Sequence, residues 1–159
     1  MAFARWSARR SFEGNWMGVN TGFVVADHAD AQRVCNSRSP KDDFPGFDAK
    51  GIDTVKLGRL QALLSGREFK PSFMADTCCS GGEDGPWVHE VPTDLVQRLG
   101  GLSPEGLQQL AEQLAATEEF SVKYVTWSSE AVLWVLQRLT ALCKRADDEG
   151  KAVFMWRCL

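Results

Sequence analysis

The sequence has no long hydrophobic segment and no excess of positive charge. None of its apolar runs approaches the roughly 20 residues that a membrane-spanning helix needs. The first residues form no continuous apolar segment of the kind found in secretory signals. Lysine and arginine number 18 against 21 aspartate and glutamate, a net charge of -3, whereas a nucleic-acid module normally carries a basic surplus. We therefore expect a cytoplasmic protein with no transmembrane segment and no nucleic-acid partner.

The chain also lacks the cysteine spacing of disulfide frameworks and zinc sites. Its five cysteines are an odd number, and Cys78 and Cys79 are adjacent, which disfavours a bridge between them. Structural zinc sites use pairs such as Cys-x2-Cys with a second pair downstream, and no such set occurs. The Gly81-Gly82 step has no lysine at Walker spacing and is followed by two carboxylates, which would repel a phosphate. We therefore expect free thiols in a reducing compartment, and we predict no metal and no cofactor.

What is present is the composition of one folded domain. The 159 residues are 44% hydrophobic and 25% charged, close to globular averages. Residues 1–16 differ from the rest, because Arg5, Arg9 and Arg10 alternate there with aromatic side chains. We interpret residues 1–16 as a basic, aromatic tail, with contact to an anionic lipid or RNA surface as the functional alternative. Residues 17–159 form the predicted domain.

Hydrophobic periodicity and capping residues predict an α+β fold. The predicted order is strand, two helices, strand, three helices and strand, which gives a small sheet of about three or more strands with several helices packed against it. The strands are expected at 19–26, 87–91 and 152–156. The helices are expected at 27–34, 53–66, 92–99, 103–114 and 128–150, with loops at 36–51 and 70–86 and an ambiguous stretch at 120–127.

The second of these loops holds two candidates for a catalytic nucleophile. Cys78 or Cys79 could act as a thiolate nucleophile with His89 or His28 as its base. Carboxylates follow closely in the sequence and would raise a thiol pKa, which works against activation. The alternative interpretation is an exposed loop with incidental cysteines and a satisfied histidine near the edge of the core. Paired carboxylates elsewhere in the chain are expected to be solvated.

Both loops carry aromatic residues next to charged ones, a combination typical of protein interfaces. The predicted partner-binding residues are Phe44, Phe47, Glu83, Asp84 and Trp87. Phe73 lies in the same loop as the acidic pair. We predict a non-catalytic protein-binding domain with a basic protein partner, for example an immunity-type protein that neutralises a toxin. The alternative is a small hydrolase or transferase that uses a Cys/His or carboxylate site.

Several short segments resemble the YfbM-like bacterial proteins of unknown function. These segments are residues 51–57, 63–66 and 141–154, and residues 85–88 and 115–119 resemble related uncharacterised bacterial proteins. Together they cover about a fifth of the chain. The first two resemble a short helix that begins with aspartate and ends in a leucine pair and glycine, and residues 141–154 resemble a closing helix and strand. The loop from Cys78 to Asp84 departs from the pattern. The resemblance implies a cytoplasmic α+β fold of bacterial origin and carries over no catalytic residue.

Overall fold

The computed structural model describes residues 20–70, 77–122 and 125–159. The predicted tail at residues 1–16 and Phe73 therefore lie outside the described residues. The described part of the chain confirms the predicted α+β class.

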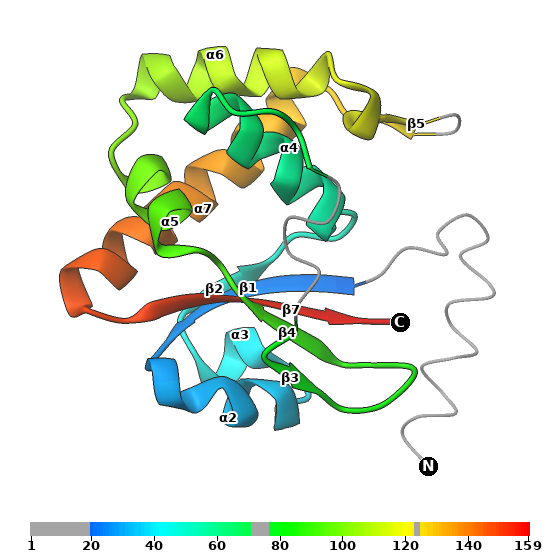
Figure 1. Cartoon of the computed structure of the whole chain (residues 1–159), viewed down its shortest axis with the longest axis vertical. Helices are drawn as coiled ribbons and strands as arrows, with labels where there is room; N and C mark the ends of the chain where they lie inside the picture. Colours follow the sequence, from blue (N-terminus) through cyan, green and yellow to red (C-terminus); the bar gives the residue numbers. More distant parts are fainter. Residues whose placement is uncertain (1–19, 71–76, 123–124) are drawn as a thin grey trace.

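The centre of the fold is a five-stranded sheet in the order β2-β1-β7-β4-β3, in which each neighbouring pair is antiparallel (Figure 1). Its strands are β1 (Asn20–Ala26), β2 (Gly46–Asp48), β3 (Cys79–Ser80), β4 (Trp87–Glu90) and β7 (Ala152–Cys158). The last strand along the chain is the middle strand of the sheet. It pairs with β1 over seven residues and with β4 over four.

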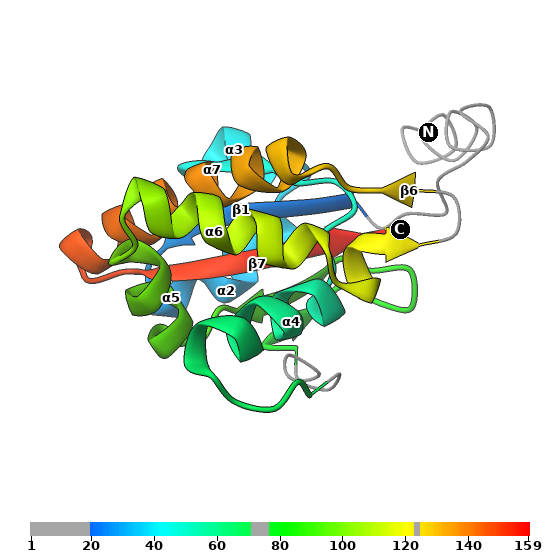
Figure 2. The same ribbon diagram turned by 90° about the horizontal axis from the view of Figure 1, so that it is seen from above.

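Helices cover both faces of this sheet, so its side chains enter two separate hydrophobic clusters. The larger cluster lies under four helices, α4 (Thr54–Ser65), α5 (Thr93–Gly100), α6 (Pro104–Ala115) and α7 (Ser129–Glu149). The smaller cluster lies on the opposite face, under α2 (Ala31–Asn36) and α3 (Pro40–Asp43). Seen from above, α7 and α4 lie on either side of α6 over the sheet (Figure 2).

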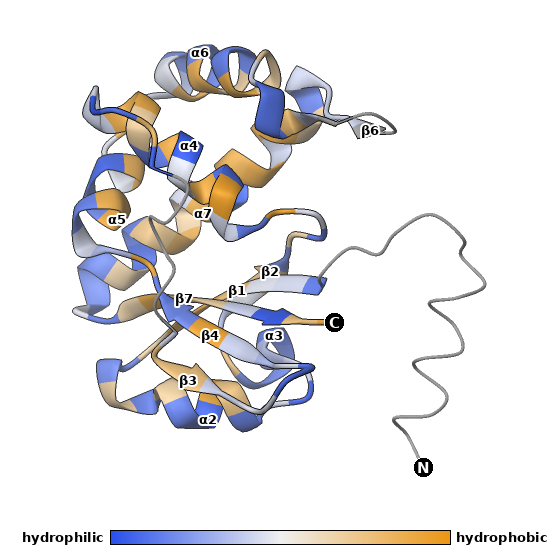
Figure 3. Cartoon of the chain, turned by 45° about the vertical axis from the view of Figure 1, so that its right-hand side comes forward, coloured by the Kyte–Doolittle hydropathy of each residue, from blue (hydrophilic) through white to orange (hydrophobic). Residues whose placement is uncertain are grey.

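The alternation of side chains along β7 shows how one strand serves both clusters. Val153 and Met155 belong to the larger cluster, whereas Phe154 and Trp156 belong to the smaller one. Because both faces are covered, these four residues are all buried. Helices α5 and α6 alternate between hydrophobic and hydrophilic residues along their length (Figure 3), as helices with one buried side do.

Capping side chains begin three of the four long helices where the sequence predicts. The side chains of Asp53, Ser103 and Ser128 each accept a hydrogen bond from the backbone amide three residues later, at 2.8, 3.0 and 3.1 Å. Gly66 and Gly150 end α4 and α7 in the left-handed conformation, which costs glycine little because it has no Cβ. Leucines at helical spacing then face the core, as the periodicity predicts.

The predicted loops contain more structure than expected. Residues 36–51 include α3 and β2, and residues 70–86 include β3. These elements are two to four residues long, too short for a periodic pattern. The helix expected at 27–34 is instead a 3-10 turn, His28–Asp30, followed by α2, and the Asp27 side chain caps neither. The ambiguous stretch at 120–127 contains a second 3-10 turn, Glu118–Phe120, and a two-stranded hairpin of β5 (Ser121–Val122) and β6 (Val125–Thr126).

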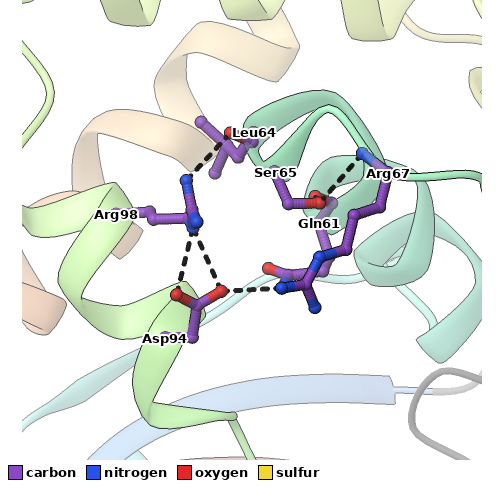
Figure 4. A network of polar contacts seen from close by, with 6 residues as sticks. All are labelled: Gln61, Leu64, Ser65, Arg67, Asp94 and Arg98. Atoms are coloured by element: carbon purple, nitrogen blue, oxygen red, sulfur yellow. Dashed lines mark hydrogen bonds and ion pairs between the residues drawn. The ribbon is translucent and has the colours of Figure 1, made fainter.

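A polar network joins the end of α4 to the start of α5 (Figure 4). Asp94 is its centre: its carboxylate accepts hydrogen bonds from Gln61 Nε2 at 3.0 Å and from Arg98 Nε at 3.0 and 3.1 Å. Arg98 also donates to the carbonyl oxygen of Leu64. These donors lower the pKa of Asp94, so the carboxylate stays ionised and holds the two helices together.

The edge strand β2 approaches β1 too closely for any side chain at Gly46. A Cβ atom there would collide with the carbonyl oxygen of Phe23 and with Val24. We expect Gly46→Ala to lower the free energy of unfolding by about 2 kcal/mol or more. At Gly100 in α5 a Cβ would meet its nearest neighbour, Lys144 Cγ, at 3.6 Å, so Gly100→Ala is the matched control, with a gain of up to about 1 kcal/mol. Urea denaturation measures both, and equal stability of the two variants would contradict the predicted packing of β2.

Candidate functional site

The structure does not bring Cys79 and His89 together. Cys79 pairs with Val88 across β3 and β4, and its side chain packs against the smaller cluster. His89 is the next residue along β4, so its side chain points to the opposite face of the sheet. The sheet itself therefore separates this thiol from this imidazole.

Cys78 does not have the surroundings of an activated nucleophile either. Its side chain is exposed, and its Sγ donates a hydrogen bond to the carbonyl oxygen of Val88 at 3.2 Å. Partial desolvation raises the pKa of the Cys78 thiol, and the nearby Glu90 carboxylate raises it further. A raised pKa keeps the sulfur in its thiol form, which is the weaker nucleophile.

His89 is a buried histidine with a defined partner. The residue is 2% exposed, and its Nε2 lies 3.1 Å from Nη2 of Arg157 on β7, the residue opposite Trp87 in the register. A guanidinium can only donate, so Nε2 of His89 accepts and the ring proton belongs on Nδ1. Burial lowers the pKa of Arg157, whose guanidinium also lies 5.8 Å from the centre of the Trp87 ring. The contact between His89 and Arg157 therefore links the side chains of β4 and β7.

The other histidine, His28, lines a hollow that the sequence gives no means of finding. His28 Nδ1 lies 2.5 Å from Glu90 Oε1, and both side chains line a hollow of about 170 Å³ between β4, α5 and the turn from α7 to β7. Thr93, Asp147 and Lys151 also line it. A carboxylate on one ring nitrogen orients the imidazole and directs the other nitrogen away from it, which suits acid–base chemistry.

The predicted partner-binding residues lie in two groups at opposite edges of the sheet. Phe44 and Phe47 are in or next to β2, whereas Glu83, Asp84 and Trp87 belong to the β3–β4 hairpin. Four strand spacings separate these edges, about 19 Å at about 4.8 Å per spacing. The five residues therefore do not form one continuous patch.

The two phenylalanines are also less available than the sequence suggests. Phe47 is 7% exposed and stacks on Phe23 with ring centres 5.7 Å apart, so it is a core residue. Phe44 is half-buried, packs against the smaller cluster and lies under the guanidinium of Arg33 at 5.3 Å. By contrast, Glu83 and Asp84 are exposed and form no ion pair with any residue that the structure describes.

The apolar stripe of the helix expected at 128–150 predicts Trp134 and Val135 in the core, but Trp134 lies on the surface. Its side chain is 48% exposed, the highest value among the large hydrophobic side chains of the described residues that are exposed. The ring meets Phe47 edge-on at 6.4 Å, and the guanidinium of Arg138 lies over it at 4.2 Å. Its neighbour Val135 is buried, as predicted. The pattern fails at Trp134 because the residue lies at the border between the buried side and the exposed side of α7.

The described residues contain neither a candidate membrane span nor a candidate metal site. Across residues 20–70, 77–122 and 125–159, no helix is long and apolar enough to cross a membrane. Within the same ranges, no three histidine, cysteine or acidic side chains are grouped so that they could hold a metal ion.

Comparison with known proteins gives a structural neighbour, and its function is unknown. No protein family and no curated protein matches the chain. Among solved structures, the chain is similar to YfbM from Escherichia coli, a protein of unknown function, with 15% sequence identity and a TM-score of 0.44. The match covers 87% of this chain and 99% of YfbM, so the structure comparison returns the same protein that the sequence segments resemble. It transfers no activity.

Proposed function

We propose that this chain is a non-catalytic protein-binding domain of bacterial type, and that its partner binds over Trp134. The observation that carries the proposal is an exposed tryptophan that is held in one orientation before any partner arrives. Tryptophan and arginine are the residue types most enriched at the energetic centres of protein interfaces. Cys35, Cys78, Cys79 and Cys143 are free thiols, which supports the cytoplasm as the place of action.

The contacts of Trp134 reduce the cost of binding. Phe47 supports the edge of its ring from the core, and Arg138 covers one face from the next turn of α7. Glu130, one turn earlier, is also exposed, so these three residues form a stripe at spacing i, i+4 along the helix. A side chain that is already ordered loses less conformational entropy when a partner packs on it.

The neighbouring strand β2 supports the proposal that the ligand of this stripe is a protein. β2 is an edge strand that pairs only with β1 among the described strands, so its outer backbone groups are available to another chain. A partner that packs on Trp134 can reach this edge and add main-chain hydrogen bonds. We propose the name Trp134 surface for Glu130, Trp134 and Arg138 together with β2.

We propose a basic partner, as an immunity-type protein would have in a toxin. The net charge of -3 and the exposed Glu83–Asp84 turn support this charge, because carboxylates without an ion pair attract a cationic surface over several ångströms. The turn lies at the far edge of the sheet from β2. Its role in the proposal is therefore to speed the encounter, while the Trp134 surface holds the complex.

We predict that Trp134→Ala removes the partner. Proteins that co-purify with the tagged full-length chain from its own cells are quantified by mass spectrometry, and at least one should fall tenfold or more in the variant. The expected loss is about 2 kcal/mol or more, the range of interface hot spots. Leu63→Ala is the matched control, because it removes another exposed hydrophobic side chain, on α4. Equal recovery of every protein with Trp134→Ala and Leu63→Ala would contradict the proposed site.

We also predict that reversing both charges of the acidic turn slows association. For the partner identified above, Glu83→Lys with Asp84→Lys should lower the association rate constant at least tenfold at low salt and leave the dissociation rate nearly unchanged. The same reversal at Glu105 and Glu112 on α6 changes the net charge equally and serves as the control. If the association rate falls equally in both double variants, the cause is the net charge and not the position of the carboxylates. That result would contradict the proposed role of the turn.

A specific observation favours one second candidate, a small hydrolase that uses His28. The imidazole is oriented by Glu90 at the border of a hollow, which is the arrangement of a general base beside a small substrate. This candidate keeps His28, one of the two bases that the sequence offers for a Cys/His site, and pairs it with the Glu90 carboxylate in place of a cysteine.

Hydrolysis of p-nitrophenyl acetate tests this second candidate. If His28 is a general base, His28→Gln should lower the rate above background at least a hundredfold. Glu90→Gln should lower it less, since the imidazole would remain but lose its orientation. Trp134→Ala should hydrolyse the ester like the unmodified chain. Equal rates for the unmodified chain and for His28→Gln would exclude hydrolysis of this ester by His28.

A further inference from the structure

Two cysteines that are 44 residues apart in the sequence lie on the same face of the sheet, the face covered by α2 and α3. Cys35 lies on α2 and is 4% exposed, whereas Cys79 lies on β3 and is half-buried. Cys35 belongs to the smaller cluster, and Cys79 packs against it, near enough to raise the pKa of the Cys35 thiol. The fold therefore places two thiols from separate elements close together on one face of the sheet.

Other contacts hold this pair in place. The Cys79 Sγ donates to Oε1 of Gln32 at 3.2 Å, and Gln32 lies three residues before Cys35 on the same helix. The Cys35 Sγ lies 4.0 Å from the carbonyl oxygen of Pro86, in the segment that leads into β4. Helix α2 and the β3–β4 hairpin thus meet through both cysteines, and each thiol has a fixed neighbour.

We propose that Cys35 and Cys79 are a redox-active dithiol, which a peroxide converts to a disulfide between α2 and β3. Cys79 is the sulfur that meets the oxidant, because it is the more exposed of the two. Cys35 is the sulfur that closes the bond, because it lies behind Cys79 in the cluster. Intracellular disulfides are usually of this transient, redox-sensing kind.

The two steps balance with hydrogen peroxide as the oxidant. The Cys79 thiol attacks one peroxide oxygen, the O–O bond breaks, and the products are a sulfenic acid and one water. The Cys35 sulfur then attacks the Cys79 sulfur, the S–OH bond breaks, and hydroxide leaves with the thiol proton as a second water. The two sulfurs lose two electrons in total, and the peroxide gains them. Burial, with the neighbouring Cys79, raises the pKa of Cys35 to about 12, so Cys35 keeps its proton until the second step.

The remaining cysteines differ from this pair in their surroundings. Cys143 is fully buried on α7 in the larger cluster, on the other side of the sheet. Cys78 is exposed and precedes β3, where its thiol donates to Val88. Cys158 packs at the border of the smaller cluster, and its Sγ lies 3.9 Å from the carbonyl oxygen of Asp84. Cys78 and Cys158 are therefore the two competitors that a test must separate.

Peroxide treatment of the full chain, followed by alkylation, trypsin digestion and mass spectrometry, tests the proposal. Residues 34–38 form one peptide with Cys35, and Cys78 and Cys79 share another. We expect a disulfide between these two peptides, with loss of two free thiols and recovery of both after a reductant. The link should persist in Cys78→Ser and Cys158→Ser and disappear in Cys79→Ser.

The order of the two steps has its own readout. In Cys35→Ala, dimedone should label Cys79 at least tenfold more than in the unmodified chain, because its sulfenic acid has lost the thiol that consumes it. Circular dichroism confirms that this variant is folded, and Cys143→Ala is the control for loss of a buried thiol. A link that persists in Cys79→Ser, or a Cys35 thiol that survives peroxide levels that oxidise Cys78, would overturn the proposal.

Discussion

The insertion of β7 between β1 and β4 is the constraint on which the rest of the structure depends. The last strand along the chain occupies the middle of the sheet. Without β7, the pair of β1 and β2 would not be joined to the pair of β3 and β4. The side chains of β7 supply both hydrophobic clusters in alternation, which fixes its register, because a shift by one residue would exchange the two sets. Helix α7 ends at Gly150, and β7 begins two residues later, so the longest helix and the central strand are positioned together.

This sheet decides which of the potentially reactive groups meet. It places His89 and Cys79, ten residues apart, on opposite faces, and it brings Cys35 and Cys79 together on one face. It also places Glu90 at the end of β4, where His28 from the 3-10 turn after β1 reaches it. Cross-strand register, and not distance along the sequence, therefore sets the chemistry available to this chain. The strand order also separates the aromatic residues near β2 from the acidic turn, because β2 and β3 are opposite edges of the sheet.

The elements with strong local signals follow from the sequence, and the sites do not. Ser103 and Ser128 predict their helices because a capping oxygen stands before a periodic apolar run, and Gly150 predicts a helix end. β2 and β3 are missed because strands of two or three residues have no periodicity, and their partners supply their stability. Trp134 is missed because helical period alone does not show how wide the buried side of α7 is. The pairs His28–Glu90 and Cys35–Cys79 each bring together residues from distant segments, which one sequence cannot reveal.

Site-specific photo-crosslinking in the native cells shows whether a protein partner binds over Trp134. A photoreactive amino acid at Gln137, which is exposed beside Arg138 on α7, would report on the Trp134 surface. The same amino acid at Gln108, exposed on α6, would report on another part of the molecule. We predict one discrete covalent adduct with a protein at position 137 and none at position 108. No adduct at 137, or the same adducts at both positions, would contradict this prediction.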